Sequence, residues 1–100
     1  MNTFKAWPQR RLRSNDKPFE STITEFLQQD CYEQLIRTLG EEQAQEQMEE
    51  TWKLIEAEMR QMGTKKPIEA ARELFRKSNY NGWVHTKCYA AIYYKARKED

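Results

Sequence analysis

The chain has 100 residues, with 17 Lys and Arg, 16 Asp and Glu and one His, so its formal net charge is +1. This length fits one compact domain with a single core. Two cysteines are too few for a disulfide scaffold, and no apolar stretch is long enough for a signal peptide or a membrane span. We therefore expect a cytoplasmic protein that does not insert into a membrane.

The small total charge hides three blocks of alternating sign: +4 over residues 1–18, −8 over residues 19–63 and +5 over residues 64–100. A block pattern of this kind is typical of basic and acidic surfaces held apart for partners, or of surfaces that cancel within a bundle or a dimer. Gly and Pro contribute only three residues each, while Glu, Gln, Ala, Leu, Lys and Arg are abundant. This composition favours helices over strands.

Residues 1–16 show no sustained hydrophobic period and contain Trp7-Pro8, so the sequence predicts an extended, flexible basic arm there. A helix over residues 17–39 follows, since Asp16 can cap it and Pro18 falls in its first turn, where a missing N–H costs nothing. Its apolar stripe ends before Gly40 and consists of Phe19, Ile23, Phe26, Leu27, Cys31, Leu35 and Leu39.

The second predicted helix covers residues 41–62 and ends before Gly63. Its near-heptad stripe, which includes three methionines that we assign to the core, consists of Ala44, Met48, Thr51, Trp52, Ile55, Met59 and Met62. The outer face is unusually acidic and carries Glu41, Glu42, Glu46, Glu49, Glu50, Glu56 and Glu58. Such a face is usually solvated, and it can also dock a basic partner or pair with the basic helices that follow in this chain.

Two further helices are predicted over residues 67–78 and 84–97, separated by the turn cluster Ser78-Asn79-Tyr80-Asn81-Gly82. The last segment also has the β-branched and aromatic content of a strand, but its apolar residues fall at helical steps. The predicted fold is all-α: a small antiparallel bundle of about four helices, forming a single domain over residues 17–98. The long, heptad-like second helix also allows a homodimer.

Aromatic and basic residues alternate near the C-terminus and predict a partner-binding face, because Tyr and Trp are typical anchors of interfaces. Five Tyr and Trp residues within fifteen positions exceed what one helix face easily buries, although they can also simply flank the core. The proposed face consists of Tyr80, Trp83, His85, Lys87, Tyr89, Tyr93, Tyr94 and Arg97.

An alternative hypothesis is that the protein is a nucleic-acid-binding module or a small subunit of a ribonucleoprotein complex. It would then bind nucleic acid mainly through phosphate contacts. The candidate residues are Arg10, Arg11, Arg13, Lys65, Lys66 and Lys95, and Trp7 can stack on a base. Against this reading, the −8 block repels a polyanion unless it is turned away.

The sequence contains no catalytic constellation and predicts neither a metal site nor a cofactor. His85 and Cys88 lie one helical turn apart, but a single His is a poor supply of ligands, and a buried Cys88 beside a surface His85 explains the pair better. We therefore predict a non-enzymatic adaptor or regulator that binds another macromolecule, most simply a protein, through the C-terminal aromatic-basic face.

Overall fold

The computed structural model describes the backbone of residues 18–98 and the side chains of residues 24–98. Within this part the chain forms α2 (Pro18–Leu39), α3 (Glu41–Met62), α4 (Pro67–Lys77) and α5 (Gly82–Lys98), and no strand. The prediction of an all-α fold with four helices is confirmed, including the helical state of the last segment. The predicted arm over residues 1–16 lies outside the described residues.

Two glycines make the turns at the ends of α3. Gly40 has φ 88° and joins α2 to α3, while Gly63 has φ 71° and closes the last turn of α3 with a backbone N–H bonded to the Met59 carbonyl at 2.8 Å. Both backbone conformations lie in the region that glycine adopts without the steric cost of a Cβ. The predicted helix boundaries at these glycines are therefore confirmed.

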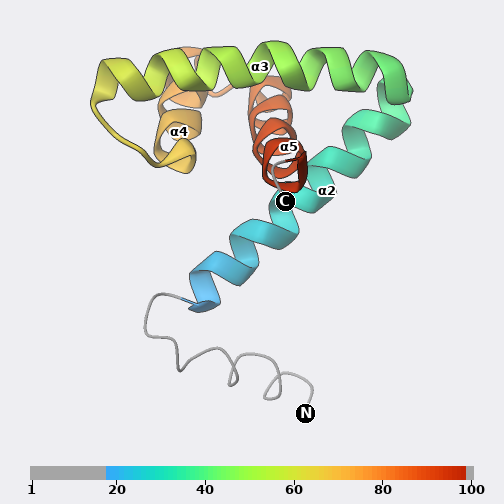
Figure 1. Ribbon diagram of the computed structural model, residues 1–100, viewed down its shortest axis with the longest axis horizontal. Coiled ribbons are helices and arrows are strands. Elements are labelled where there is room, and N and C mark those ends of the chain that lie inside the picture. Colours follow the sequence, from blue (N-terminus) through green and yellow to red (C-terminus); the bar gives the residue numbers. More distant parts are fainter. Residues whose placement is uncertain (1–17, 99–100) are drawn as a thin grey trace.

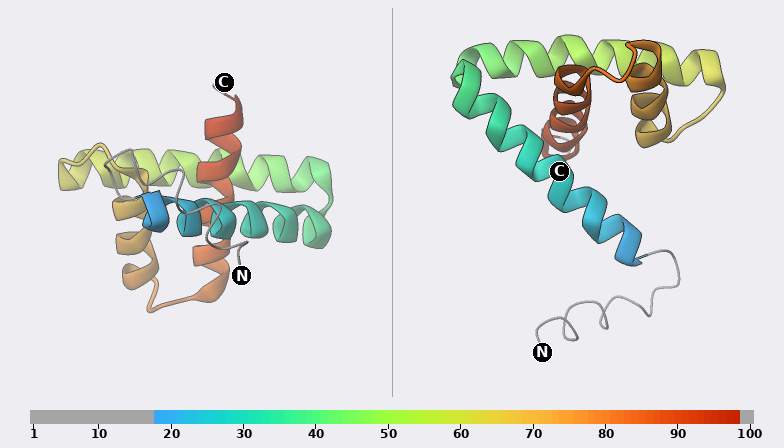
Figure 2. Two further views of the ribbon diagram at one scale, coloured as in Figure 1. Left: turned by 90° about the horizontal axis from the view of Figure 1, so that it is seen from below. Right: turned by 180° about the vertical axis from the view of Figure 1, so that it is seen from behind.

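The helices form two antiparallel pairs that cross one another. Figure 1 shows α2 and α3 meeting in a V, with α5 lying between the two arms, and Gly40 is the one residue between the two helices. In Figure 2, α4 and α5 run side by side in opposite directions and cross α2 and α3 steeply. The axes are thus not all aligned as in a simple up-down bundle, and α5 contacts each of the other three helices.

The middle of α5 is buried on all sides because three helices surround it. Five consecutive residues are buried: Cys88, Tyr89, Ala90, Ala91 and Ile92. A helix that is buried all round carries apolar or small residues on every face, which explains why the single stripe expected from the sequence covers only part of the buried surface. The two small alanines allow neighbouring helices to approach the α5 backbone closely.

The predicted stripes of α2 and α3 also contribute to the core, but three of their described residues are exposed. Leu35, Ala44, Met48 and Ile55 are buried as expected. Phe26 and Leu27 are exposed, since the first half of α2 projects beyond the other helices (Figure 1), and Met62 is exposed in the last turn of α3. The side chains of Phe19 and Ile23 lie outside the described residues.

Candidate functional site

The residues of the predicted C-terminal face lie in different places, because Tyr80 is in the turn before α5 and the others extend along α5 from Trp83 to Arg97. Tyr80 and Trp83 are exposed at the α4–α5 turn, with 63% and 37% of their surface accessible. Tyr89 is buried, so it belongs to the core rather than to a contact surface. His85, Lys87, Tyr93 and Tyr94 are half-buried, and Arg97 is exposed.

The α4–α5 turn is held by side-chain caps and by ring packing. The side-chain Oδ1 of Asn81 accepts hydrogen bonds from the backbone N–H of Trp83 at 2.8 Å and of Val84 at 3.4 Å, so Asn81 caps α5. This cap starts the helix two residues earlier than predicted. The Tyr80 ring meets the Phe75 ring edge-on, with centroids 5.3 Å apart.

Behind the turn, a row of rings leads from the surface into the core. The Phe75 ring lies 5.2 Å from the His85 ring, and His85 stacks on the buried Tyr89 at 4.5 Å. Offset and edge-on ring contacts at these distances stabilise beyond simple area burial. His85 therefore packs between α4 and α5. The exposed Tyr80 packs against the Phe75 ring on α4.

At the other end of α5 the aromatic and basic residues are engaged within the molecule. The Tyr93 ring lies 5.0 Å from the Tyr32 ring on α2, and the Arg97 guanidinium carbon lies 4.3 Å from the Tyr93 ring centroid. Such cation–π and ring contacts join the C-terminal turns of α5 to α2. These residues stabilise the fold, which leaves less of their surface for a partner.

Tyr94 connects α5 to α3 through a charged hydrogen bond. Its hydroxyl donates to Glu49 Oε2 at 2.8 Å, and Lys98 Nζ lies 3.7 Å from the same oxygen. The Tyr94 hydrogen bond, followed by the charges of Lys95 and Lys98, lowers the pKa of the Glu49 carboxyl. Burial and the bond to Glu49 raise the pKa of the Tyr94 phenol.

The acidic face of α3 is partly paired with basic residues from later in the chain, as the sequence suggested. Besides Glu49, the buried Glu58 accepts two hydrogen bonds from Lys77 Nζ on α4, at 3.1 and 2.9 Å. The other acids of this face are exposed: Glu41, Glu42, Glu46, Glu50 and Glu56.

The candidate phosphate contacts do not gather in one place within the described residues. Lys65 and Lys66 are exposed in the linker between α3 and α4. Lys95 lies close enough to Glu49, in the first half of α3, to lower the pKa of that carboxyl. Arg10, Arg11 and Arg13 lie outside the described residues.

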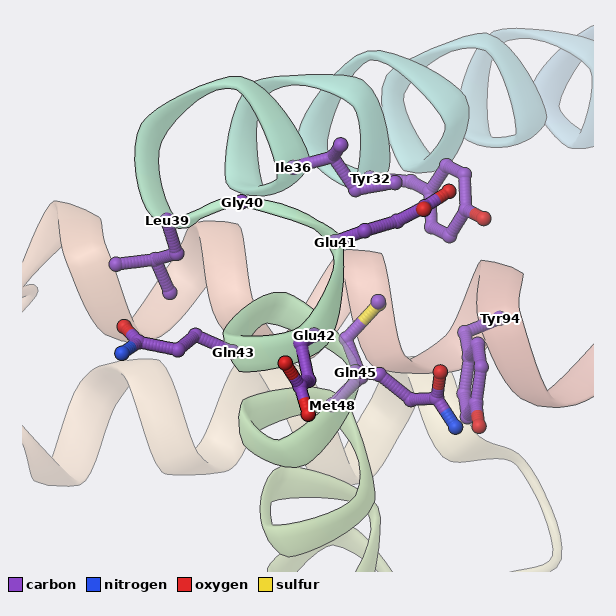
Figure 3. Close-up of a pocket in the computed structure, with 10 residues that line it drawn as sticks. All are labelled: Tyr32, Ile36, Leu39, Gly40, Glu41, Glu42, Gln43, Gln45, Met48 and Tyr94. Atoms are coloured by element: carbon purple, nitrogen blue, oxygen red, sulfur yellow. The ribbon is translucent and has the colours of Figure 1, made fainter.

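A groove opens where α2 and α3 meet. It has a volume of about 760 Å³ and is lined by Tyr32, Ile36, Leu39, Gly40, Glu41, Glu42, Gln43, Gln45, Met48 and Tyr94. Figure 3 shows that α2 contributes Tyr32, Ile36 and Leu39, α3 contributes the acids and amides together with Met48, and Tyr94 closes the end at α5. The groove therefore combines apolar side chains with two exposed carboxylates.

The sequence did not predict this groove, although the acids and Tyr94 stood out separately as candidate contact residues. The aromatic and apolar lining residues that the sequence did not indicate are Tyr32 and Ile36, which follow the core positions Cys31 and Leu35 by one residue each. Two apolar stripes displaced by one position make the apolar surface of a helix wide enough for two neighbours. This doubled stripe on α2 is the sequence feature from which the groove could have been predicted.

Neither thiol is activated for chemistry. Cys31 and Cys88 are free and buried, burial raises the pKa of Cys88 to about 11, and burial followed by the charge of Asp30 raises the pKa of Cys31. Among residues 24–98, no three His, Cys, Asp or Glu side chains are grouped so that they can hold a metal ion.

Comparison with known proteins finds no match: no family model, no curated protein and no solved structure is similar to the chain. No helix of the described part is long and apolar enough to cross a bilayer.

Proposed function

We propose that the protein is a non-enzymatic adaptor or regulator that binds another protein through the α4–α5 turn, with Tyr80 and Trp83 as anchors. The observation that carries this proposal is the exposure of two large aromatic side chains within four residues, on a turn fixed by a cap and by packed rings. Tyr and Trp are the residues most enriched at the energetic centres of protein interfaces.

The backbone of the turn supports the same proposal. Asn79 and Tyr80 have φ values of 65° and 61°, so two consecutive non-glycine residues are left-handed. Asparagine adopts this conformation with little strain, whereas a bulky tyrosine does so at a cost of about 1–3 kcal/mol. A strained residue with an exposed ring is better explained by the orientation it gives that ring than by the stability of the fold.

The remaining residues of the predicted face take secondary roles in this proposal. Lys87, half-buried one turn beyond Trp83, and Arg97, at the far end of α5, extend the contact toward an acidic partner. The two reduced, buried thiols are compatible with the cytoplasm, where thiols stay reduced.

The proposal is tested by affinity capture from a cell extract, comparing the wild-type chain with the double variant Tyr80→Ala/Trp83→Ala. We expect a specific set of captured proteins to be lost from the double variant while its helical circular dichroism is unchanged. Leu54→Ala is the matched control, since Leu54 is also a large exposed hydrophobic residue, at 59%, but lies on α3.

Equal capture by the double variant would place the contact surface elsewhere. A capture signal that disappears after nuclease treatment and weakens steeply with salt would support the nucleic-acid reading instead.

A further inference from the structure

The groove between α2 and α3 has the chemistry of a site for a basic segment that carries large apolar side chains. Its accessible apolar surface comes from the half-buried Ile36 and Leu39, and its rim carries the carboxylates of Glu41 and Glu42. Both carboxylates are exposed, and no cation pairs with either of them within the described part of the chain. The bare surface therefore lacks both an apolar cover and a positive charge.

The N-terminal seventeen residues of the same chain supply both. They contain five Lys and Arg against a single acid, together with Phe4, Trp7 and Leu12. This segment has a net charge of +4 and directly precedes α2 in the chain. Helix α2 forms one wall of the groove. Charge complementarity and proximity along the chain thus point to one occupant.

The N-terminal segment is long enough to reach the groove from the start of α2. Pro18, which begins α2, lies eleven residue steps after Trp7, and an extended chain covers roughly 36 Å over that length. The path back along α2 from Pro18 to Tyr32 is about 21 Å, and to Leu39 about 32 Å, at 1.5 Å per residue. Trp7 can therefore enter the groove of its own molecule while Arg10 and Arg11 follow along α2.

The surface of α2 offers a track for such a path. Glu25, Gln29, Tyr32 and Ile36 follow one another at steps of three and four residues, so they share one face of the helix. Glu25 and Gln29 are exposed, and Gln29 Nε2 donates to Glu33 at 3.2 Å, which holds a further carboxylate beside this face. A basic segment that runs antiparallel to α2 meets acids before it reaches the groove.

We propose that residues 1–17 dock in the α2–α3 groove of the same molecule, with Trp7 against Ile36 and Leu39, with Lys5 near Glu41 and Glu42, and with Arg10 and Arg11 along α2. Docking covers the apolar side chains of the groove and neutralises its rim. A separate basic partner segment then has to displace the N-terminal segment in order to bind at this groove, which is distinct from the α4–α5 turn.

The test uses the full chain with the photoreactive residue p-benzoylphenylalanine in place of Trp7, irradiated and mapped by mass spectrometry. We expect cross-links to Ile36 or Leu39 in the band of monomer mass. The double variant Glu41→Lys/Glu42→Lys should reduce their yield at least about fivefold, and high salt should reduce it as well. Glu50→Lys/Glu56→Lys makes the same charge change at exposed acids of α3 outside the groove lining and should leave the yield unchanged.

Helical circular dichroism checks that both double variants fold, and the milder pair Glu41→Gln/Glu42→Gln serves if the lysine variant does not. Cross-links outside the groove, or a yield that the rim substitutions leave unchanged, would overturn the proposal. Cross-links found only in a band of dimer mass would also overturn it, because the groove would then hold the segment of a second copy.

Discussion

The ion pair between Glu58 and Lys77 should contribute more to the free energy of unfolding than the exposed ion pair between Glu73 and Arg76 on α4. The Glu58 side chain is 8% exposed and receives two hydrogen bonds from Lys77 Nζ, while Lys77 itself stays 45% exposed. Hydrogen bonds to charged groups contribute about 1.5–3 kcal/mol, and the exposure of Lys77 keeps the value below the 3–5 kcal/mol lost when a fully buried pair is broken. We expect a coupling energy of about 1–2 kcal/mol.

A double-mutant cycle measures this energy. Urea unfolding is followed by circular dichroism for the wild type, Glu58→Gln, Lys77→Met and the double variant, at neutral pH and moderate salt. Lys77→Met alone should lower the midpoint of thermal unfolding by several degrees, since about 1 kcal/mol corresponds to about 4–8 °C in a domain of this size. It removes the cation but keeps an apolar side chain beside the buried carboxylate.

The matched control is the ion pair between Arg76 and Glu73, which lies within α4 and includes an arginine side chain that is 58% exposed. Its cycle should give a much smaller coupling energy, because solvent screens a pair on a helix surface. If the Glu58–Lys77 coupling is no larger than this control, burial of Glu58 does not strengthen the pair and the reasoning is refuted.

Three further predictions concern the core. Ile55→Ala should cost about 2–5 kcal/mol of unfolding free energy because Ile55 is fully buried, whereas Leu54→Ala, at the exposed neighbouring position, should change it by less than about 0.5 kcal/mol in urea unfolding. Ala91→Leu should destabilise by about 1–3 kcal/mol by separating the helices around α5, while Ala96→Leu on the exposed part of the same helix should be nearly neutral; equal effects would contradict the central position of α5. Since the pKa of Cys88 is raised to about 11, its thiol should react with a disulfide reagent at mildly alkaline pH far more slowly in the folded chain than in denaturant, and equal rates would show that it is accessible.

The sequence was sufficient to predict the elements of this fold because their signals are local. Gly40 and Gly63 end helices through their own backbone freedom, and the stripes containing Leu35, Met48 and Ile55 identify the core face of each helix from periodicity alone. Pairing of the acidic helix with basic residues from later in the chain was also within reach, since opposite charge blocks follow one another.

The candidate surface could be predicted only in part, because exposure depends on which helices surround a residue. The aromatic residues Tyr80 and Trp83, which are exposed in the structure, were singled out from composition and from the turn that contains Tyr80. The burial of Tyr89 was not, since it results from the position of α5 among three helices.

Local chemistry in the sequence thus determined where each helix begins and ends, which face of α2 and α3 is apolar, and where opposite charges lie along the chain. The tertiary structure alone decided that α5 becomes the central helix, because the crossing of two helix pairs depends on the packing of residues far apart in sequence. It also decided that Tyr32, Met48 and Tyr94, which come from three different helices, line one groove with an acidic rim.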